Sequence, residues 1–279
     1  MKLTKDIELY SNLNEDIKIY RSEGILNAEE LDLDDYTKNA LLPKPNWINN
    51  IQKIETIRNS KVHSMNTSMF YGKLSDNFIL LLDKLNLKEC EDINDVLSFF
   101  KENESLSRQI NNQITSFIES TFFQHSYDIK FHTLAITSPG IRSINYIENK
   151  NGRREYTGLH FDRSEIQPFG SFHKSKQRIC INLGETRYVY FSPYSANEIT
   201  SELYKKYKNV VFEDVLHLYK DHFSKEPIYI MAIPKGHFYI APSDNVLHDG
   251  SSIYHNSYDV CAVFLGNFNI FCENGISFL

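Results

Sequence analysis

Residues 235–250 read KGHFYIAPSDNVLHDG, and this stretch carries the strongest indication of the fold. Gly236 marks a turn, an apolar strand-like run follows at 237–240, and a bend that contains Pro242 leads to His248. Short apolar runs between turn residues are typical of all-β architectures. The stretch therefore predicts strands in the second half of the chain.

The same texture extends over residues 128–279, where short segments rich in Ile, Val, Tyr and Phe alternate with Gly, Pro, Asn and Asp. Eight short strands suit a two-sheet jelly roll, the double-stranded β-helix of cupins and related barrels. Residues 196–223 are expected to form a helical insertion between strands. The strands are expected at 130–137, 141–147, 156–161, 178–183, 188–191, 228–233, 237–240 and 258–265.

Residues 1–127 show a different pattern, because apolar residues recur there every three or four positions. Asn27 followed by AEEL predicts a helix that stops before Pro43, Asn46 predicts a second helix with Trp47, Ile48, Ile51 and Ile54 on one face, and Ser75 predicts a third. The longest helix is expected from Glu104 to Phe123, with an apolar stripe that should lie against a sheet. We therefore expect an α+β fold, in which a helical N-terminal region (1–127) packs on a β core (128–279). The stripe consists of Leu106, Ile110, Ile114 and Phe117.

Composition limits the class of protein. The chain has 279 residues, 41% of them hydrophobic, and a formal net charge of -6, so a sizeable core is expected and a basic nucleic-acid interface is not. The first twenty residues lack the apolar run of a signal peptide or membrane span, so a cytoplasmic location is expected. The cysteines, Cys90, Cys180, Cys261 and Cys272, form no CxxC pair and are expected to be structural and reduced.

Three residues suggest a metal centre: His160 and Asp162 in GLHFDRS, and His248 in NVLHDGSS. Residues two apart in a strand face the same side, so an HxD pair can bring an imidazole and a carboxylate to one point, and a distant strand supplies the third ligand. Two histidines and one carboxylate on one face of an octahedron are the ligand set of non-haem Fe(II) oxygenases. His237 and His255 are alternative ligands, and a metal-free barrel in which the three residues are merely polar also remains open.

The motifs around these residues resemble the Fe(II)/2-oxoglutarate-dependent dioxygenase superfamily. Its barrels repeatedly show a strand, a Pro bend and Leu-His at the second metal histidine, as in residues 235–250 here. The stretch INYIENKNGRREYTGLHFD (144–162) is similar to the prolyl-hydroxylase-like pattern, in which an Asn-Tyr pair precedes a glycine-containing loop and HxD. The resemblance covers about residues 130–270 and implies Fe(II), 2-oxoglutarate and O2, with Asn145 and Tyr146 as the Asn-Tyr pair and Tyr146 donating a hydrogen bond to the cosubstrate carboxylate.

The sequence departs from the superfamily where a base should anchor 2-oxoglutarate. The superfamily usually places this base on the last barrel strand, about ten residues after the second histidine, where this chain has Tyr258 and Asp259. Some branches place it on a middle strand, which makes Arg178 and Arg187 the candidates and Arg142 a third choice. A buried arginine suits this role because it binds a carboxylate through two hydrogen bonds.

The resemblance favours hydroxylation of an unactivated C–H bond in a small molecule such as an amino acid or a biosynthetic intermediate. Asp162 fills the position that related halogenases leave to a halide, although desaturation or cyclisation would use the same ligands. Arg153, Arg154 and Arg163 could receive a substrate carboxylate. The helical parts could form a lid or a homodimer contact, and no nucleic-acid or membrane partner is expected. The missing base after His248 keeps open a cupin-type dioxygenase or isomerase that does not use 2-oxoglutarate.

Overall fold

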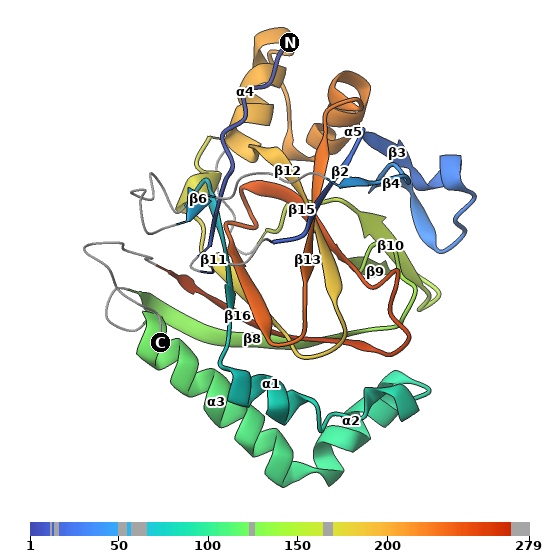
Figure 1. Ribbon diagram of the computed structural model, residues 1–279. Helices are drawn as coiled ribbons and strands as arrows, with labels where there is room; N and C mark the ends of the chain where they lie inside the picture. Colours follow the sequence, from blue (N-terminus) through green and yellow to red (C-terminus); the bar gives the residue numbers. More distant parts are fainter. Residues whose placement is uncertain are drawn as a thin grey trace.

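Two large β-sheets, in which most neighbouring strands are antiparallel, pack against each other at the centre of the molecule (Figure 1). The structure, a computed structural model, describes residues 1–11, 13, 17–49, 55–56, 66–122, 126–163 and 170–268. The seven-stranded sheet has the order β6 (Glu55–Thr56), β1 (Glu8–Ser11), β7 (Ser68–Lys73), β14 (His237–Ala241), β11 (Gln177–Asn182), β16 (Asp259–Asn267) and β8 (Tyr127–Thr137). The five-stranded sheet has the order β15 (Val246–Ser251), β12 (Arg187–Ser195), β13 (Ile228–Ile233), β2 (Ile19–Ser22) and β5 (Ile48–Asn49).

A third, four-stranded sheet flanks the other two. Its order is β3 (Ile25–Asn27), β4 (Tyr36–Pro43), β10 (Arg154–Gly158) and β9 (Tyr146–Glu148). β10 runs parallel to β4 and antiparallel to β9. Gly158 ends β10 with a φ of +75°, and a Cβ at this position would lie 2.4 Å from the backbone oxygen of Leu41. The close approach of β10 to β4 therefore requires glycine two residues before His160.

The core between the two large sheets follows from the alternation of side chains along each strand. On β11, Cys180 faces the inner cluster, whereas Ile179 and Ile181 face the opposite side. On β12, Val189 and Phe191 face inward in the same way. Side chains of both sheets, among them Met69, Tyr71, Met231, Tyr239 and Val263, meet in this inner cluster, which holds the two sheets together.

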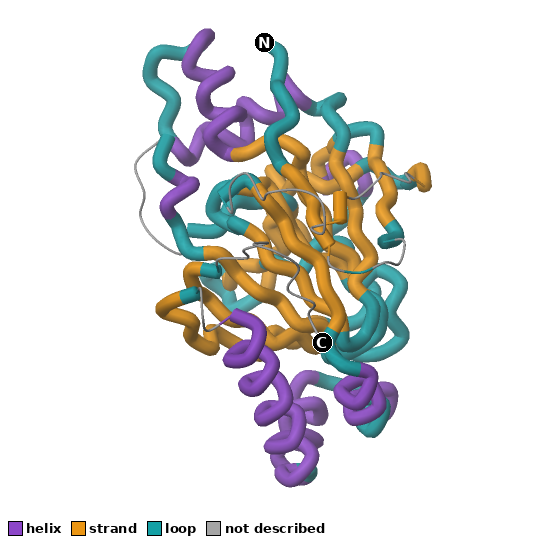
Figure 2. Tube along the Cα trace, turned by 60° about the vertical axis from the view of Figure 1, so that its left-hand side comes forward, coloured by secondary structure: helices purple, strands orange, loops and turns teal. Residues whose placement is uncertain are grey.

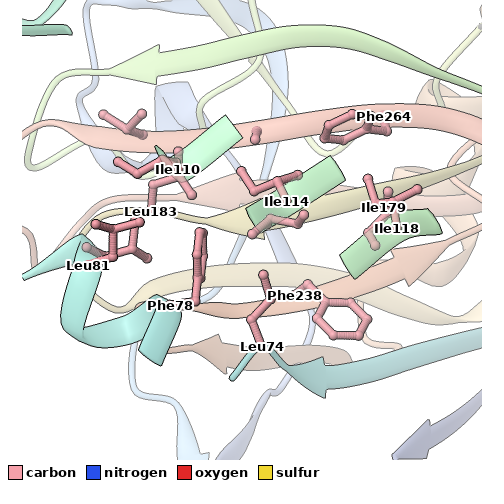
Figure 3. Packing of buried hydrophobic residues seen from close by; sticks show 14 of the residues in the cluster. Leu74, Phe78, Leu81, Ile110, Ile114, Ile118, Ile179, Leu183, Phe238 and Phe264 are labelled. Atoms are coloured by element: carbon pink, nitrogen blue, oxygen red, sulfur yellow. The ribbon is translucent and has the colours of Figure 1, made fainter. Parts of the chain in front are cut away.

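Helices cover the outer face of the seven-stranded sheet. These are α1 (Asp76–Leu82), α2 (Ile93–Glu102) and α3 (Glu104–Phe122). Figure 3 shows Ile110, Ile114 and Ile118 of α3 lying over the strands that carry Ile179 and Phe264. Spacing of three and four residues along α3 places these isoleucines on one face, and all three are buried.

The opposite end of the molecule carries α4 (Ala196–Lys206) and α5 (Phe212–Phe223), which pack on the outer face of the five-stranded sheet. Figure 2 shows the strands between these two groups of helices. None of the helices in the described ranges combines the length and the apolar composition that crossing a bilayer requires.

The expected helical region over residues 1–127 is wrong for its first 75 residues. The helix predicted from Asn27 is a single 3-10 turn, Ala28–Leu31, and the chain continues as β4. The helix predicted from Asn46 is replaced by β5 at Ile48–Asn49, while Ile51 and Ile54 lie outside the described residues. The helices predicted from Ser75 and from Glu104 are confirmed as α1 and α3, although Phe123 lies outside the described residues.

The strand predictions for the second half are mostly confirmed, and the helical insertion at 196–223 is present as α4 and α5. Of the segment 141–147, only the end forms a strand, β9. The sequence analysis missed β15 (Val246–Ser251), the strand that carries His248. The division of the chain at residues 127 and 128 stays a prediction.

Candidate metal centre

The backbones of His160 and His248 lie side by side as an isolated antiparallel bridge. The amide of each residue donates a hydrogen bond to the carbonyl of the other, at 3.0 Å in both directions. β15, which carries His248, is held on its other edge by β12, where Phe191 is opposite His248. Directly opposed residues of an antiparallel pair point their side chains to the same side of the sheet. This pairing is why two residues far apart in sequence bring their imidazoles together.

Asp162 completes a cluster in which the three ligand atoms all lie within 4.8 Å of one another. The amide of Asp162 donates to the carbonyl of Ser243 at 3.1 Å, which fixes the chain two residues after His160. Its carboxylate oxygens lie 3.5 Å from Nε2 of His160 and 3.6 Å from Nε2 of His248. Ligands about 2.1 Å from a metal on one octahedral face are about 3 Å apart, so these three atoms need only small shifts to bind one ion.

Both histidines are oriented by their own backbone. Nδ1 of His160 lies 3.0 Å from the carbonyl oxygen of Gly158, and Nδ1 of His248 lies 2.8 Å from that of Val246. Because a carbonyl oxygen only accepts, each Nδ1 carries a proton, and each Nε2 is the ring atom that faces Asp162 and that a metal ion would bind. Such hydrogen bonds fix the tautomer and ring orientation of metal-binding histidines.

Burial and charge set the protonation of the three residues. Burial would raise the pKa of Asp162, but the hydrogen bond from His160 and the nearby His248 and Arg178 hold this pKa well below its usual range. Burial lowers the pKa of His248 to about 4, so this imidazole is neutral at pH 7. Burial also opposes protonation of His160, but the bond to Asp162 and the charge of Asp249 raise its pKa. An anionic carboxylate between two imidazoles is suited to a divalent cation.

Arg178 contacts the cluster directly. Its Nε lies 2.7 Å from Oδ2 of Asp162, and both side chains are largely buried. Arg178 is one of the two arginines that the sequence offers as the anchor of a cosubstrate. Arg178 and Cys180 line the same cavity, and the guanidinium of Arg178 also contacts the carboxylate of Asp162. Arg178 therefore holds one oxygen of Asp162 in place.

Arg187 is the most deeply buried cation in the cavity. Only 3% of its side chain is exposed, and its Nη1 lies 3.4 Å from Oδ2 of Asp259, which is itself buried. Burial alone would lower the pKa of Arg187, but the charge of Asp259 keeps this guanidinium protonated. On the last strand, near the position where the superfamily usually has a base, this chain has the acid Asp259. The cation that pairs with it, Arg187, lies on β12.

The three candidate ligands line a cavity of about 460 Å³. Its inner wall includes Arg187, Cys180, Cys261 and Tyr239. Asn145, Tyr146 and Arg154 also line it, and the guanidinium of Arg154 lies 4.5 Å above the ring of Tyr146. Tyr146 is 41% exposed, which places it at the mouth of the cavity.

The other sequence candidates are elsewhere. His237 stacks on Tyr71, and Nε2 of His255 contacts the carbonyl of Thr186, so neither alternative histidine lines this cavity. Arg153 forms an ion pair with Asp35, and Arg163 pairs with Glu213 at 3.4 Å. Arg142 lines a different cavity. Of the basic residues that the sequence analysis named, only Arg154, Arg178 and Arg187 line the cavity of the three candidate ligands.

Several residues of the cavity wall were not predicted from the sequence, among them Cys261, Tyr239 and Asp249. Cys261 and Tyr239 belong to no recognisable motif, whereas Asp249 directly follows His248 in NVLHDGSS. Cys180 and Cys261 are hydrogen-bonded to each other, and this bond helps to lower the pKa of Cys180 to about 7. Alternation along β14 and β16 could have indicated Tyr239 and Cys261, once the inward face of either strand was known.

No family model matches the chain, and no curated protein matches it. Among solved structures, the chain is similar to two structures of the Kdo hydroxylase KdoO, a non-heme Fe(II) alphaketoglutarate dependent dioxygenase. One of them is a complex with succinate and Fe(III), and the other is the apo structure. In both cases the sequence identity is 14%, the TM-score is 0.40, and the match covers 74% of this chain and 81% of that chain. These neighbours have the activity of the superfamily that the HxD and Leu-His motifs resemble.

Proposed function

We propose that the protein is a non-haem Fe(II)- and 2-oxoglutarate-dependent oxygenase that hydroxylates an unactivated C–H bond of a small molecule. The observation that carries the proposal is the convergence of His160, Asp162 and His248 on one point inside a cavity. Two imidazole nitrogens and one carboxylate leave half of an octahedron for a cosubstrate and O2. Iron held in this way, together with the cosubstrate and O2, would supply the oxidant that removes hydrogen from the C–H bond.

The fold supports the same proposal. The seven- and five-stranded sheets pack face to face, and residues of both contribute to one inner core. We assign this pair of sheets to the double-stranded β-helix, or jelly roll, with the candidate ligands where β15 meets the segment after β10. In this assignment, β1, β2, β5, β6 and β7 are additions to the barrel from the first 75 residues.

Arg187 is the residue that we assign to the far carboxylate of 2-oxoglutarate. It lines the same cavity as the three ligands, it is buried, and its Nη1 contacts Asp259 at the long distance of 3.4 Å. Arg178 is less suitable, because its Nε is already 2.7 Å from Asp162. A buried guanidinium binds a carboxylate more strongly than an exposed one, because the effective dielectric constant is lower there. The hydrogen bond from Tyr146 to the cosubstrate stays a prediction.

The mouth of the cavity supports a proposal for the substrate class. A volume of about 460 Å³ suits a small molecule. Arg154 lines the cavity above Tyr146, whereas Arg153 and Arg163 pair with acidic residues outside it. We therefore propose a substrate that carries a carboxylate, received by Arg154, as an amino acid or a biosynthetic acid would.

A second candidate is a cupin-type metal-dependent dioxygenase or isomerase that does not use 2-oxoglutarate. The Arg187–Asp259 ion pair favours this alternative, because Asp259 partly neutralises the cation that would bind the cosubstrate. Both candidates require the same three ligands, so they differ only in whether a keto acid binds next to the metal.

Anaerobic titration tests the metal site. Purified protein should bind one Fe(II), and subsequent addition of 2-oxoglutarate should produce the weak visible charge-transfer band of an iron-bound keto acid. Asp162→Ala should abolish both signals, and unchanged iron affinity in this variant would disprove the ligand assignment. Iron binding without the band would favour the cupin-type alternative.

The anchor is tested by Arg187→Gln, which should weaken 2-oxoglutarate binding at least tenfold while one Fe(II) still binds. Arg187→Lys keeps the charge and should restore part of the affinity, which separates loss of an anchor from misfolding. Arg153→Gln is the matched control, because this arginine is ion-paired on the surface and should leave both affinities unchanged. An unaltered 2-oxoglutarate affinity in Arg187→Gln would contradict the assignment.

A further inference from the structure

A second cavity, of about 680 Å³, lies on the other side of the five-stranded sheet from the candidate metal centre. Neighbouring residues of β12 show this arrangement, because Arg187 lines the first cavity and Tyr188 lines the second. Within the described part of the chain, the two cavities share no lining residue. The second cavity is lined by Tyr20, Pro45, Asn46, Trp47, Arg142, Tyr188, Ile253 and Tyr254.

Four aromatic rings form the wall of this cavity, with Trp47 at their centre. The ring of Trp47 lies 6.2 Å from Tyr20, 5.5 Å from Tyr188 and 5.8 Å from Tyr254, measured between centroids. Tyr254 is 62% exposed although its ring is part of the wall, and Trp47 and Tyr188 are half-buried. Aromatic side chains that are partly exposed on one wall offer flat apolar faces to a ligand ring.

Arg142 supplies a charge to this wall. Its side chain is half-buried, and it makes no ion pair and no side-chain hydrogen bond with any of the residues that the structure describes; only its backbone amide is bonded, to the hydroxyl of Tyr36. Among the residues that the structure describes, none with a carboxylate lines the cavity. A half-buried guanidinium without a counter-ion loses hydration and is stabilised by an anion, and a carboxylate matches its geometry.

From these contacts we infer that the second cavity binds a small organic acid in which a carboxylate is attached to a ring. The carboxylate pairs with Arg142, and the ring lies on the aromatic wall around Trp47. The inference does not depend on the proposed oxygenase activity, because no candidate metal ligand lines this cavity. An aryl acid, a saturated ring acid and a sugar acid all carry a carboxylate on a ring. Their relative affinities therefore identify the type of ring that the cavity prefers.

Fluorescence can report on this cavity directly, because Trp47 is the only tryptophan of the chain. The full-length protein is titrated with benzoate, cyclohexanecarboxylate, glucuronate and the uncharged benzamide. At least one acid should change the Trp47 emission saturably, and benzamide should bind at least tenfold more weakly than benzoate if the aryl acid is preferred. Absence of a saturable change with all three acids up to millimolar concentration would overturn the inference.

Variants distinguish the contribution of the Arg142 charge to acid binding from that of the aromatic wall. Arg142→Gln should weaken binding of the preferred acid at least tenfold, Arg142→Lys should recover part of it, and Tyr254→Ala should weaken acid and uncharged analogue alike. Arg153→Gln is the control, because it removes an exposed arginine that does not line this cavity; it should leave acid binding unchanged. Equal affinity in wild type and Arg142→Gln would overturn the assignment of the carboxylate to Arg142. Asp162→Ala should bind the acid as wild type does, so the proposed oxygenase could fail while this inference stands.

Discussion

Asp249 is a buried carboxylate next to His248 that takes no part in the candidate ligand set. Burial raises its pKa to about 6, although the charge of His160, a hydrogen bond from Ser143 and the amides of Gly250 and Asn145 oppose the rise. Only 1% of the residue is exposed. At neutral pH the folded protein therefore holds a charge at a site that favours the neutral acid.

This residue predicts a specific pH dependence of stability. Because the folded-state pKa of about 6 exceeds the ordinary value of 3.8, the folded protein holds this proton between those values and the unfolded chain does not. The contribution to stability is thus complete below about pH 4 and is lost as the pH rises through 6. Asp249→Asn should raise the free energy of unfolding of metal-free protein by up to about 3 kcal/mol at neutral pH.

Urea unfolding of wild type and Asp249→Asn with a chelator present, at several pH values, measures this difference. The gain should shrink as the pH falls and vanish near pH 4. Ser143→Ala, which removes one hydrogen-bond donor to the same carboxylate, should raise the pKa of Asp249 further. A gain for Asp249→Asn that is independent of pH would show that packing, and not the charge, causes it.

At the scale of single residues, the sequence predicted the convergence of the three candidate ligands but not the pairing of the arginines. His160 and Asp162 are local in sequence, and the motif around His248 is recognisable. Arg187 of β12 pairs with Asp259 of β16, and Arg178 of β11 pairs with Asp162, which lies in the segment after β10. Register between strands, which decides such contacts, leaves no local signal in a sequence.

At the scale of elements, α3 provides the clearest test of the outer core. Ile114 is 4% exposed and packs in the cluster between α3 and the seven-stranded sheet (Figure 3). Ile114→Ala should lower the free energy of unfolding by about 3 kcal/mol, because it removes buried methyl groups and leaves a cavity. Thermal or urea unfolding followed by circular dichroism measures the loss.

Thr115→Ala is the matched control, since Thr115 is exposed on the same helix turn and alanine favours a helix. It should change the free energy of unfolding by no more than about 0.5 kcal/mol. Equal losses in the two variants would show that helix propensity, and not packing against the sheet, decides the stability of α3.

The elements that were predicted wrongly show where local signals stop being sufficient. Asn27 does form a capping box with Glu30, so the start of a helix was read correctly. The helix ends after one turn because Asp32 adopts a left-handed conformation, with φ of 53°. Asn46 likewise has φ of 71° and precedes a strand rather than a helix. Asparagine and aspartate adopt this conformation without a glycine to mark it.

At the scale of the whole molecule, the first 75 residues complete both large sheets. β7 pairs with β14, and β2 pairs with β13. Met69 and Tyr71 of β7 reach the inner core, and Phe70 reaches the cluster under the helices. Periodicity along one segment cannot show that it pairs with strands much later in the chain, such as β13 and β14, which is why this part of the architecture was not predicted.

These pairings predict that residues 128–279 do not fold alone, against a division of the chain into independent halves. Without β7 and β2, the edges of β14 and β13 lose their partners, and apolar faces that α1–α3 cover become exposed. The isolated fragment should show no cooperative unfolding transition, whereas co-expression with residues 1–127 should restore one. A fragment that unfolds cooperatively and binds Fe(II) as tightly as the full chain would establish the β core as an autonomous domain, because the three candidate ligands all lie within it.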